Sequence, residues 1–358
     1  MHNIVWILLY LSQLSFITAV NATSNINILS VGDWGSAALG GYHLRNAQDT
    51  SNAMQAYLNE YSPKLVLNPG DNFYYCGIQN GSDPQINEDF IKLFGGIHLP
   101  WYNVLGNHDY GFNPDAQLWL NQTISTWIMD ARYYHRRVVL DPDPDPNSSL
   151  ILNIIVLDTN PCISDYRGND RAKWDPCGIQ YPTCEPIADE CRFHENILQQ
   201  DCKAQLEWFR TTLESIDATN EWIFVLGHHK ANEIDVEDFQ DVLSDARIHL
   251  YINGHTHLLD HYAIDDAPKY MTTGAGGMVI IGQNEEGESN DEAVTTMINA
   301  TITHRVRSMW SKVITGFTSH TFINSHDSYS KMITEFWDTK QNLLYNFTIY
   351  KNSTITTM

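Results

Sequence analysis

Short runs of β-branched and other apolar residues alternate along the chain with segments of helical periodicity. The apolar runs at residues 26–31, 64–68 and 101–105 predict buried strands, and residues 47–61 between the first two predict a helix. The pattern then repeats, with further strands expected at residues 150–157, 222–226 and 249–253 and a second helix at residues 204–216. The alternation of strands and helices predicts an α/β core.

The last part of the chain has strand patterns without helices between them. Residues 270–273, 316–324, 331–336 and 343–350 predict antiparallel strands that close the domain. Residues 141–149, with Asp-Pro repeats, and the acidic residues 283–292 predict exposed loops. There is no internal repeat, and we expect one large domain over residues 23–358 of the 358-residue chain.

The N-terminus predicts a cleaved signal peptide over residues 1–22. Residues 4–17 are apolar, and small and polar residues follow them. The alternative is a buried N-terminal strand or helix, but residues 26–30 already provide a first strand. Glycosylation sequons favour a secreted or lumenal protein, lysosomes and vacuoles included; they lie at Asn80, Asn121, Asn147, Asn299, Asn346 and Asn352. No apolar run of membrane-spanning length follows, so no membrane anchor is expected.

Six cysteines in a chain bound for an oxidising compartment predict disulfides. Five of them lie between Cys162 and Cys202, which predicts a disulfide-stapled surface insertion at about residues 160–202. The spacing leaves the pairing open. A zinc site is the alternative, but no CxxC pair occurs.

The formal net charge of −22 argues against nucleic acid and anionic membranes as partners, because the summed field repels polyanions. A small phosphate ester would need local positive charge in its site. Bound metal cations would provide that charge.

Short polar motifs follow the strands, at the place where open α/β sheets bind ligands. They are Gly32-Asp33-Trp34-Gly35, Gly70-Asp71-Asn72-Phe73-Tyr74, Gly106-Asn107-His108-Asp109, Val225-Leu226-Gly227-His228 and Gly254-His255-Thr256-His257. Each motif alone predicts only a turn. Together we expect them to converge at one edge of a sheet, where carboxylates beside imidazoles suit iron, zinc or manganese. His255 and His257 can point toward two different ions from a loop, which favours two metals over one.

These motifs, in this order, resemble those of the purple acid phosphatases, especially the small tartrate-resistant type. In the wider metallophosphoesterase superfamily the first motif is usually Asp-x-His, whereas here Gly35 takes the histidine position and Tyr74 stands in the second motif. Residues 155–159 and 270–277 also resemble that family. The resemblance implies a four-layer α/β/β/α sandwich with two central mixed β-sheets.

The resemblance also implies the ligands of two ions per subunit. A ferric ion would bind Asp33, Asp71, Tyr74 and His257. A divalent ion, Fe(II), Zn(II) or Mn(II), would bind Asp71, Asn107, His228 and His255, so that Asp71 bridges the pair. A metal-bound hydroxide would attack a small phosphomonoester at acidic pH, as in an acid phosphatase, a phosphoric monoester hydrolase.

Two histidines beside the ligands have open roles. His108 would contact the phosphate or assist the leaving group, as the resemblance implies, or it is a structural histidine bonded to backbone with Asp109 as a partner. His229 faces the substrate or packs. Trp34 is expected to pack beneath the site, and Trp119 and Trp127 are expected on the buried face of a helix. The other histidines, His43 among them, are assigned no role.

The chain departs from the animal enzymes after the fourth motif. Residues 230–240 contain no histidine, and Glu237 or Asp238 stands near the position of a catalytic one, so the leaving-group acid is open. Leu258 replaces an asparagine of the family. One alternative function is therefore a non-catalytic scaffold, as in the gliding-motility anchor of apicomplexan parasites, although all seven expected ligands are present. Another is a phosphodiesterase or nucleotidase of the same superfamily.

Overall fold

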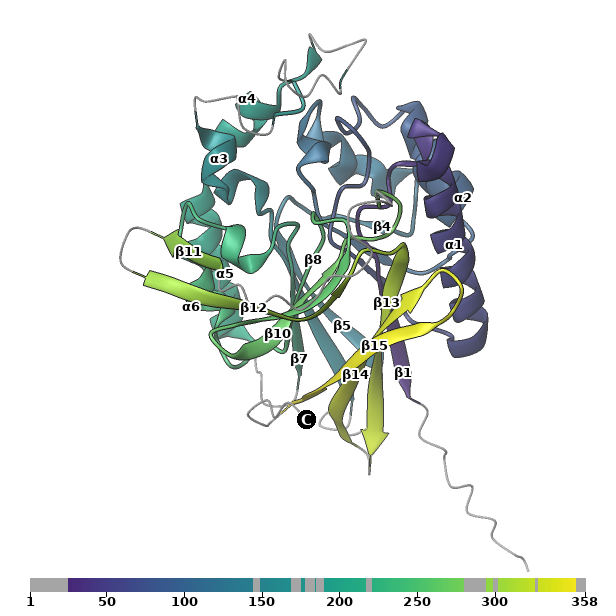
Figure 1. Ribbon diagram of the computed structural model, residues 1–358, viewed down its shortest axis with the longest axis vertical. Helices are drawn as coiled ribbons and strands as arrows, with labels where there is room; N and C mark the ends of the chain where they lie inside the picture. Colours follow the sequence, from purple (N-terminus) through teal and green to yellow (C-terminus); the bar gives the residue numbers. More distant parts are fainter. Residues whose placement is uncertain are drawn as a thin grey trace, which may run out of the picture.

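Two β-sheets lie face to face in the middle of the protein, with helices on the outer side of each (Figure 1). The computed structural model describes residues 25–143, 149–168, 175–177, 184, 190–216, 221–279, 294–298, 302–325 and 328–351. The expected signal peptide and the acidic loop at 283–292 lie outside these ranges, as do residues 144–148 of the Asp-Pro loop. The four layers confirm the predicted α/β/β/α sandwich.

The first sheet has seven strands in the order β15-β14-β13-β1-β2-β3-β4. Strands β1 to β4 are parallel, and β13 joins them by pairing antiparallel with β1. Their bounds are β1 Ile26–Ser30, β2 Val66–Asn68, β3 Trp101–Asn103, β4 Trp127–Ile128, β13 Gly316–Ser325, β14 Ser328–Asp338 and β15 Leu343–Tyr350. The expected antiparallel strands 316–324, 331–336 and 343–350 are confirmed.

The second sheet has eight strands in the order β11-β12-β9-β10-β8-β7-β6-β5. Strands β6, β7, β8 and β10 are parallel. Strand β10 contains the expected antiparallel strand at residues 270–273, but it is antiparallel only to β9 and parallel to β8. Their bounds are β5 Tyr134–Asp141, β6 Leu150–Val156, β7 Trp222–Leu226, β8 Leu250–Asn253, β9 Leu259–Ile264, β10 Ala267–Thr273, β11 Val294–Ile298 and β12 Ile302–Lys312. Strands β6, β7 and β8 are buried along their whole length, which explains their continuous apolar runs.

Helices cover the outer faces of both sheets (Figure 1). Helix α1 (Gly41–Tyr61) and α2 (Lys92–Phe94) lie beside the first sheet, and α5 (Cys202–Ser215) and α6 (Phe239–Leu243) lie beside the second. The remaining helices are α3 Ser164–Arg167, α4 Phe193–Leu198, a π-helix at Ile86–Ile91 and short 3₁₀ helices, including Ala37–Leu39, His108–Tyr110, Pro114–Gln122, Asn160–Cys162 and Ala231–Glu233. None of the helices in the described ranges is long and apolar enough to cross a membrane.

The cysteines form three disulfides, Cys76–Cys184, Cys162–Cys202 and Cys177–Cys191. The first of them ties the cysteine-rich segment to the loop that follows the second motif. This confirms disulfides over a zinc site and indicates folding in a non-cytosolic compartment.

Two expectations about the core are wrong. The five motifs end strands of two sheets, with the first three on one sheet and the last two on the other, and not one edge of a single sheet. Trp119 and Trp127 do not share a helix face, because Trp127 is fully buried in β4 whereas the side chain of Trp119 is 61% exposed. Trp34 does pack as expected: it is fully buried, contacts Phe73 and donates to Asn68 Oδ1 at 3.0 Å.

Candidate metal centre

The seven side chains expected as metal ligands lie together where β1, β2, β3, β7 and β8 end. The five donors that follow β1, β2, β3 and β7 are almost fully buried. They are Asp33, Asp71, Tyr74, Asn107 and His228. His255 and His257 follow β8 and keep partial exposure. The two sheets therefore bring donors from residues 33 to 257 into one cluster that opens to solvent on the histidine side.

One group of donors surrounds the hydroxyl of Tyr74. Tyr74 Oη lies 3.1 Å from Asp33 Oδ1, 2.9 Å from Asp71 Oδ2 and 3.2 Å from His257 Nε2. His257 Nε2 is also 3.5 Å from Asp33 Oδ1. These four residues are the set that the resemblance implies for the ferric ion.

A second group surrounds the side-chain oxygen of Asn107. Asn107 Oδ1 lies 2.8 Å from His228 Nε2 and 3.0 Å from His255 Nδ1. His228 Nε2 is 3.3 Å from Asp71 Oδ2. Asp71 therefore contacts both groups, and the donors divide into the two sets that the resemblance implies.

The backbone is strained at four of these residues. Asp33, Asp71, His255 and His257 have φ angles of 56°, 54°, 72° and 51°, in the left-handed region that non-glycine residues rarely adopt. Each such residue costs on the order of 1 kcal/mol or more, and such strain gathers at functional sites. The consequence is visible at His255 and His257, which are two residues apart and face different donor groups.

Two glycines make room for the donors. A Cβ on Gly254 would collide with the Asp33 carboxylate, and a Cβ on Gly35 would collide with the backbone of Asn72. The carbonyl of Gly35 instead accepts the backbone N–H of Tyr74 at 2.8 Å. Gly35, which stands where the wider superfamily has a histidine, thus has no space for a side chain. The hydroxyl of Tyr74 lies among the donors instead.

A buried carboxylate holds the second and third motifs together. Asp109 accepts the backbone N–H groups of Gly106 at 2.8 Å and of Asn72 and Phe73 at 3.1 Å, and Gln117 donates to it at 2.8 Å. Asp109 therefore accepts hydrogen bonds from three backbone N–H groups and from Gln117, and so fixes the loops that carry the second and third motifs.

His108 is instead fixed by a carbonyl. Its Nδ1 lies 2.6 Å from the carbonyl oxygen of Tyr75, and its ring centroid is 4.3 Å from that of Tyr74. A carbonyl only accepts, so Nδ1 donates and Nε2 is the acceptor of the neutral ring. The backbone bond expected of a structural histidine is present, and it is compatible with a role for Nε2.

His229 is bonded at both ring nitrogens. Nδ1 lies 2.8 Å from Thr159 Oγ1 and Nε2 lies 3.0 Å from Tyr166 Oη, while the ring centroid is 4.5 Å from that of His255. His229 therefore packs behind a donor. No sequence pattern pointed to Tyr166, which reaches the site from the cysteine-rich segment.

Acidic residues after the fourth motif are engaged in local structure. Asp238 accepts the N–H of Asp241 at 3.0 Å and caps α6, and Glu233 accepts the N–H of Lys230 at 3.0 Å. Lys230 Nζ lies 2.5 Å from Asp260 Oδ2. The positive charge that follows His228 is thus already neutralised by a carboxylate.

Burial and neighbouring charges shift the pKa values of the donors. Burial raises the pKa of Asp33 well above its usual value. Burial also acts to raise the pKa of Asp71, but attraction to His228 and His108 leaves it below its usual value. Burial opposes protonation of His228, yet attraction to Asp71 raises the pKa of His228 to about 9. Burial lowers the pKa of His255 to about 3 and the pKa of His257 to about 4.

This donor set suits metal ions. Two buried carboxylates have only one imidazolium to balance them, and a cation would relieve the burial cost of Asp33. Asp33, Asp71 and His228 offer ligand atoms that all lie within 4.8 Å of one another. Carboxylate, amide and imidazole groups together are ligands of iron, zinc and manganese.

Residues 26–259 match the calcineurin-like phosphoesterase family, and the chain belongs to that family. It is similar to tartrate-resistant acid phosphatase type 5 of Oryctolagus cuniculus, with 26% identity over 76% of this chain and 80% of the relative. It is also similar to purple acid phosphatase 7 of Arabidopsis thaliana, with 27% identity over 70% of each chain. The resemblance to purple acid phosphatases is thereby confirmed.

Solved structures show the same fold. GAP50, described as the anchor in the inner membrane complex of Plasmodium, aligns with a TM-score of 0.61 and 20% identity over 91% of this chain and 89% of that one. A dimetal phosphatase of Danio rerio aligns with a TM-score of 0.52 and 14% identity over 91% and 99%. At these identities the likeness supports the architecture alone.

Proposed function

We propose that the chain is a secreted or lumenal acid phosphatase that hydrolyses small phosphomonoesters with two metal ions. The observation that carries the proposal is the division of seven donors into two groups that share Asp71. Membership of the phosphoesterase family and the acid phosphatase relatives support phosphoester hydrolysis.

Asp33, Asp71, Tyr74 and His257 would hold Fe(III), and Asp71, Asn107, His228 and His255 would hold Fe(II), Zn(II) or Mn(II). When bound, the ions would supply the positive charge and Lewis acidity that phosphoryl transfer needs. Lys230 cannot supply that charge, because Asp260 already pairs with it.

His108 is the residue we assign to the substrate. The Tyr75 carbonyl holds its ring so that Nε2 is the nitrogen that accepts or delivers a proton. Asp109 fixes the loop before it through Gly106. His108 would thus position the phosphoryl oxygens or protonate the leaving group, a task for which residues 230–240 offer no histidine.

Secretion is supported by the disulfides and by the sequons. Asn80, Asn121 and Asn346, the sequon residues in the described part of the chain, are all exposed. Exposure is required for attachment of a glycan.

The test is release of inorganic phosphate from an aryl phosphate at pH 4 to 8, with wild type beside His255→Ala. We expect a maximum in acid and a loss of at least about 100-fold in the variant, because a ligand mutation removes most of the metal-dependent rate. The matched control is His98→Ala, an exposed histidine on the surface, which we expect to keep full activity.

The same assay separates the alternatives. A folded, metal-loaded wild type that releases no phosphate from any ester would favour a non-catalytic scaffold, and the lack of a histidine in residues 230–240 would be the cause to examine. Preference for a phosphodiester or a nucleotide over the aryl phosphate would indicate a phosphodiesterase or nucleotidase.

A further inference from the structure

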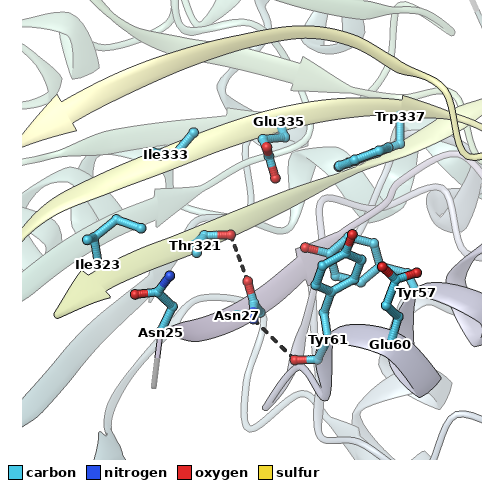
Figure 2. A pocket seen from close by; sticks show the side chains of 10 residues that line it. All are labelled: Asn25, Asn27, Tyr57, Glu60, Tyr61, Thr321, Ile323, Ile333, Glu335 and Trp337. Atoms are coloured by element: carbon cyan, nitrogen blue, oxygen red, sulfur yellow. Dashed lines mark hydrogen bonds between the residues drawn. The ribbon is translucent and has the colours of Figure 1, made fainter. Parts of the chain in front are cut away.

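A pocket of about 460 Å³ lies away from the metal centre, beside the start of β1 (Figure 2). The donors of the metal centre follow the end of that strand, at Asp33 and beyond. The pocket walls come from β1, the last turn of α1 and the strands β13 and β14. The residues that line it are Asn25, Asn27, Tyr57, Glu60, Tyr61, Thr321, Ile323, Ile333, Glu335 and Trp337.

Three aromatic rings form part of its wall. The ring centroid of Tyr57 is 4.3 Å from that of Tyr61 and 5.9 Å from that of Trp337. The indole N–H of Trp337 donates to Ser319 Oγ at 3.0 Å, which fixes this ring against the sheet. The aromatic wall is therefore held in place before any ligand arrives.

The polar part of the pocket is negative. Glu60 and Glu335 line it, and no lysine, arginine or histidine does. Within the described part of the chain neither carboxylate forms an ion pair, and Glu335 accepts only a hydroxyl bond from Ser319 at 3.3 Å. The C-terminal end of α1, a 21-residue helix, adds partial negative charge at the same place.

The amide at the floor of the pocket is already engaged within the protein. Asn27 Nδ2 donates to the carbonyl of Tyr61 at 3.1 Å, and Thr321 donates to Asn27 Oδ1 at 2.7 Å (Figure 2). Asn27 therefore links α1 to β13 and is not set up to select a polar neutral ligand.

We propose that this pocket binds a small organic ammonium compound. Tyr57 is buried behind Tyr61 and Trp337. An alkylammonium ion beside the rings of Tyr61 and Trp337 and the two carboxylates gains both cation–π attraction and charge neutralisation. The pocket volume is at the lower end of the roughly 300–1,000 Å³ found for small-molecule sites. A neutral sugar would leave the half-buried carboxylate of Glu335 uncompensated, and an anion would be repelled.

The test is calorimetric titration of the purified protein with choline, together with the change in tryptophan fluorescence that a ligand against Trp337 produces. The uncharged isostere 3,3-dimethylbutanol has the same shape, and we expect it to bind at least about tenfold more weakly, since 1.4 kcal/mol is tenfold. Titration with tetramethylammonium chloride measures the binding of the ammonium head without the hydroxyethyl group of choline.

Two variants locate the binding. Glu335→Gln and Trp337→Leu are each expected to weaken choline about tenfold or more, whereas Glu207→Gln, an exposed glutamate on α5, is expected to leave it unchanged. Aryl phosphate hydrolysis is expected to stay at the wild-type rate in all three, and circular dichroism checks that each variant is folded.

Equal binding of choline and its uncharged isostere would overturn the proposal, as would the absence of choline binding to wild type. Choline binding that survives in both pocket variants, or preference for a methyl glycoside over choline, would do the same. None of these results bears on the phosphatase, because the pocket shares no residue with the metal centre.

Discussion

At the residue scale, the hydroxyl of Tyr74 joins the donors proposed for the ferric ion. Burial and the charges of Asp33 and Asp71 raise the pKa of Tyr74 well above its usual value, so the chain alone keeps this phenol protonated. Only a strong cation within bonding distance would ionise it. The proposed iron therefore makes a specific prediction at this residue.

We expect the iron-loaded wild type to absorb visible light through tyrosinate-to-iron charge transfer and Tyr74→Phe to lose this band. The matched control is Tyr75→Phe, which removes the hydroxyl of the next residue, outside the donor set. Absorption spectra are recorded beside iron content by elemental analysis. A colourless wild type that contains its iron would exclude Tyr74 as a ligand.

A second prediction concerns the residues behind His255. Tyr166→Phe removes the hydroxyl 3.0 Å from His229 Nε2, and the ring of His229 packs on that of His255. Groups that hold a metal ligand in place alter metal affinity by about 10–100-fold, and Tyr166 acts on His255 indirectly, through the ring of His229. We expect divalent metal to bind about tenfold more weakly in Tyr166→Phe, measured by competition with a chelator. The control is Tyr133→Phe, whose ring packs on Trp208 with the centroids 4.9 Å apart and is not a member of the donor set, and it is expected to bind metal normally. Equal affinities in all three proteins would leave Tyr166 a packing residue only.

At the scale of elements, the strands that carry the motifs could be predicted because they are buried along their length and therefore mostly apolar. Strand β9 was missed because Asp260 and His261 interrupt its apolar pattern. In the structure Lys230 pairs with Asp260, and His261 lies 3.0 Å from Tyr345 Oη. These partners are distant in sequence, so no local pattern announces them.

Strand β5 was missed for a related reason. Arg136 and Arg137 lie in the middle of this edge strand and pair with Asp130 and Glu221. The expectation of a single sheet was wrong for the same reason: neighbouring strands in a sheet can be distant in sequence, as β1 and β13 are, which pair across almost 300 residues. The resemblance to a known family implied both the two sheets and the ligand set. The residue patterns alone predicted only that metal-binding side chains follow the ends of buried strands.

The pairing of β13 leads to a prediction about acid stability. His320 is fully buried on β13, with Nε2 3.0 Å from Ser30 Oγ and Nδ1 3.0 Å from Thr334 Oγ1, and burial lowers its pKa to about 3. The folded pKa lies below the unfolded value of about 6.5. Its stabilising contribution is therefore complete above pH 6.5 and is lost as the pH falls from 6.5 toward 3.

Between pH 7 and pH 4.5 this loss amounts to about 2–3 kcal/mol, at 1.36 kcal/mol for each pH unit below about 6.5. We expect His320→Gln to be less stable than wild type at pH 7 but to lose about 2 kcal/mol less on acidification. Urea unfolding at both pH values measures the difference, with the exposed His98→Gln as control. The same acid loss in wild type and His320→Gln would show that His320 has the same pKa in the folded protein as in the unfolded chain, against the burial argument.

At the scale of the whole molecule, the charge of −22 opposes the approach of the substrate that the metal centre would attract. Attraction by two bound cations acts within the site, whereas repulsion by the surface acts over the Debye length, about 30 Å at 0.01 M salt and 8 Å at 0.15 M. Salt therefore screens the repulsion first. We expect kcat/KM for an aryl phosphate to rise several-fold between these salt concentrations, with kcat unchanged.

The effect should be steeper for a substrate with more negative charge, such as a nucleoside triphosphate, because the repulsive energy grows with the charge of the ligand. Rates are compared at matched ionic strength in sodium chloride and sodium acetate, which separates screening from inhibition by one anion. A fall in kcat/KM in both salts would mean that the positive field of the metal centre extends beyond the cleft and outweighs the acidic surface.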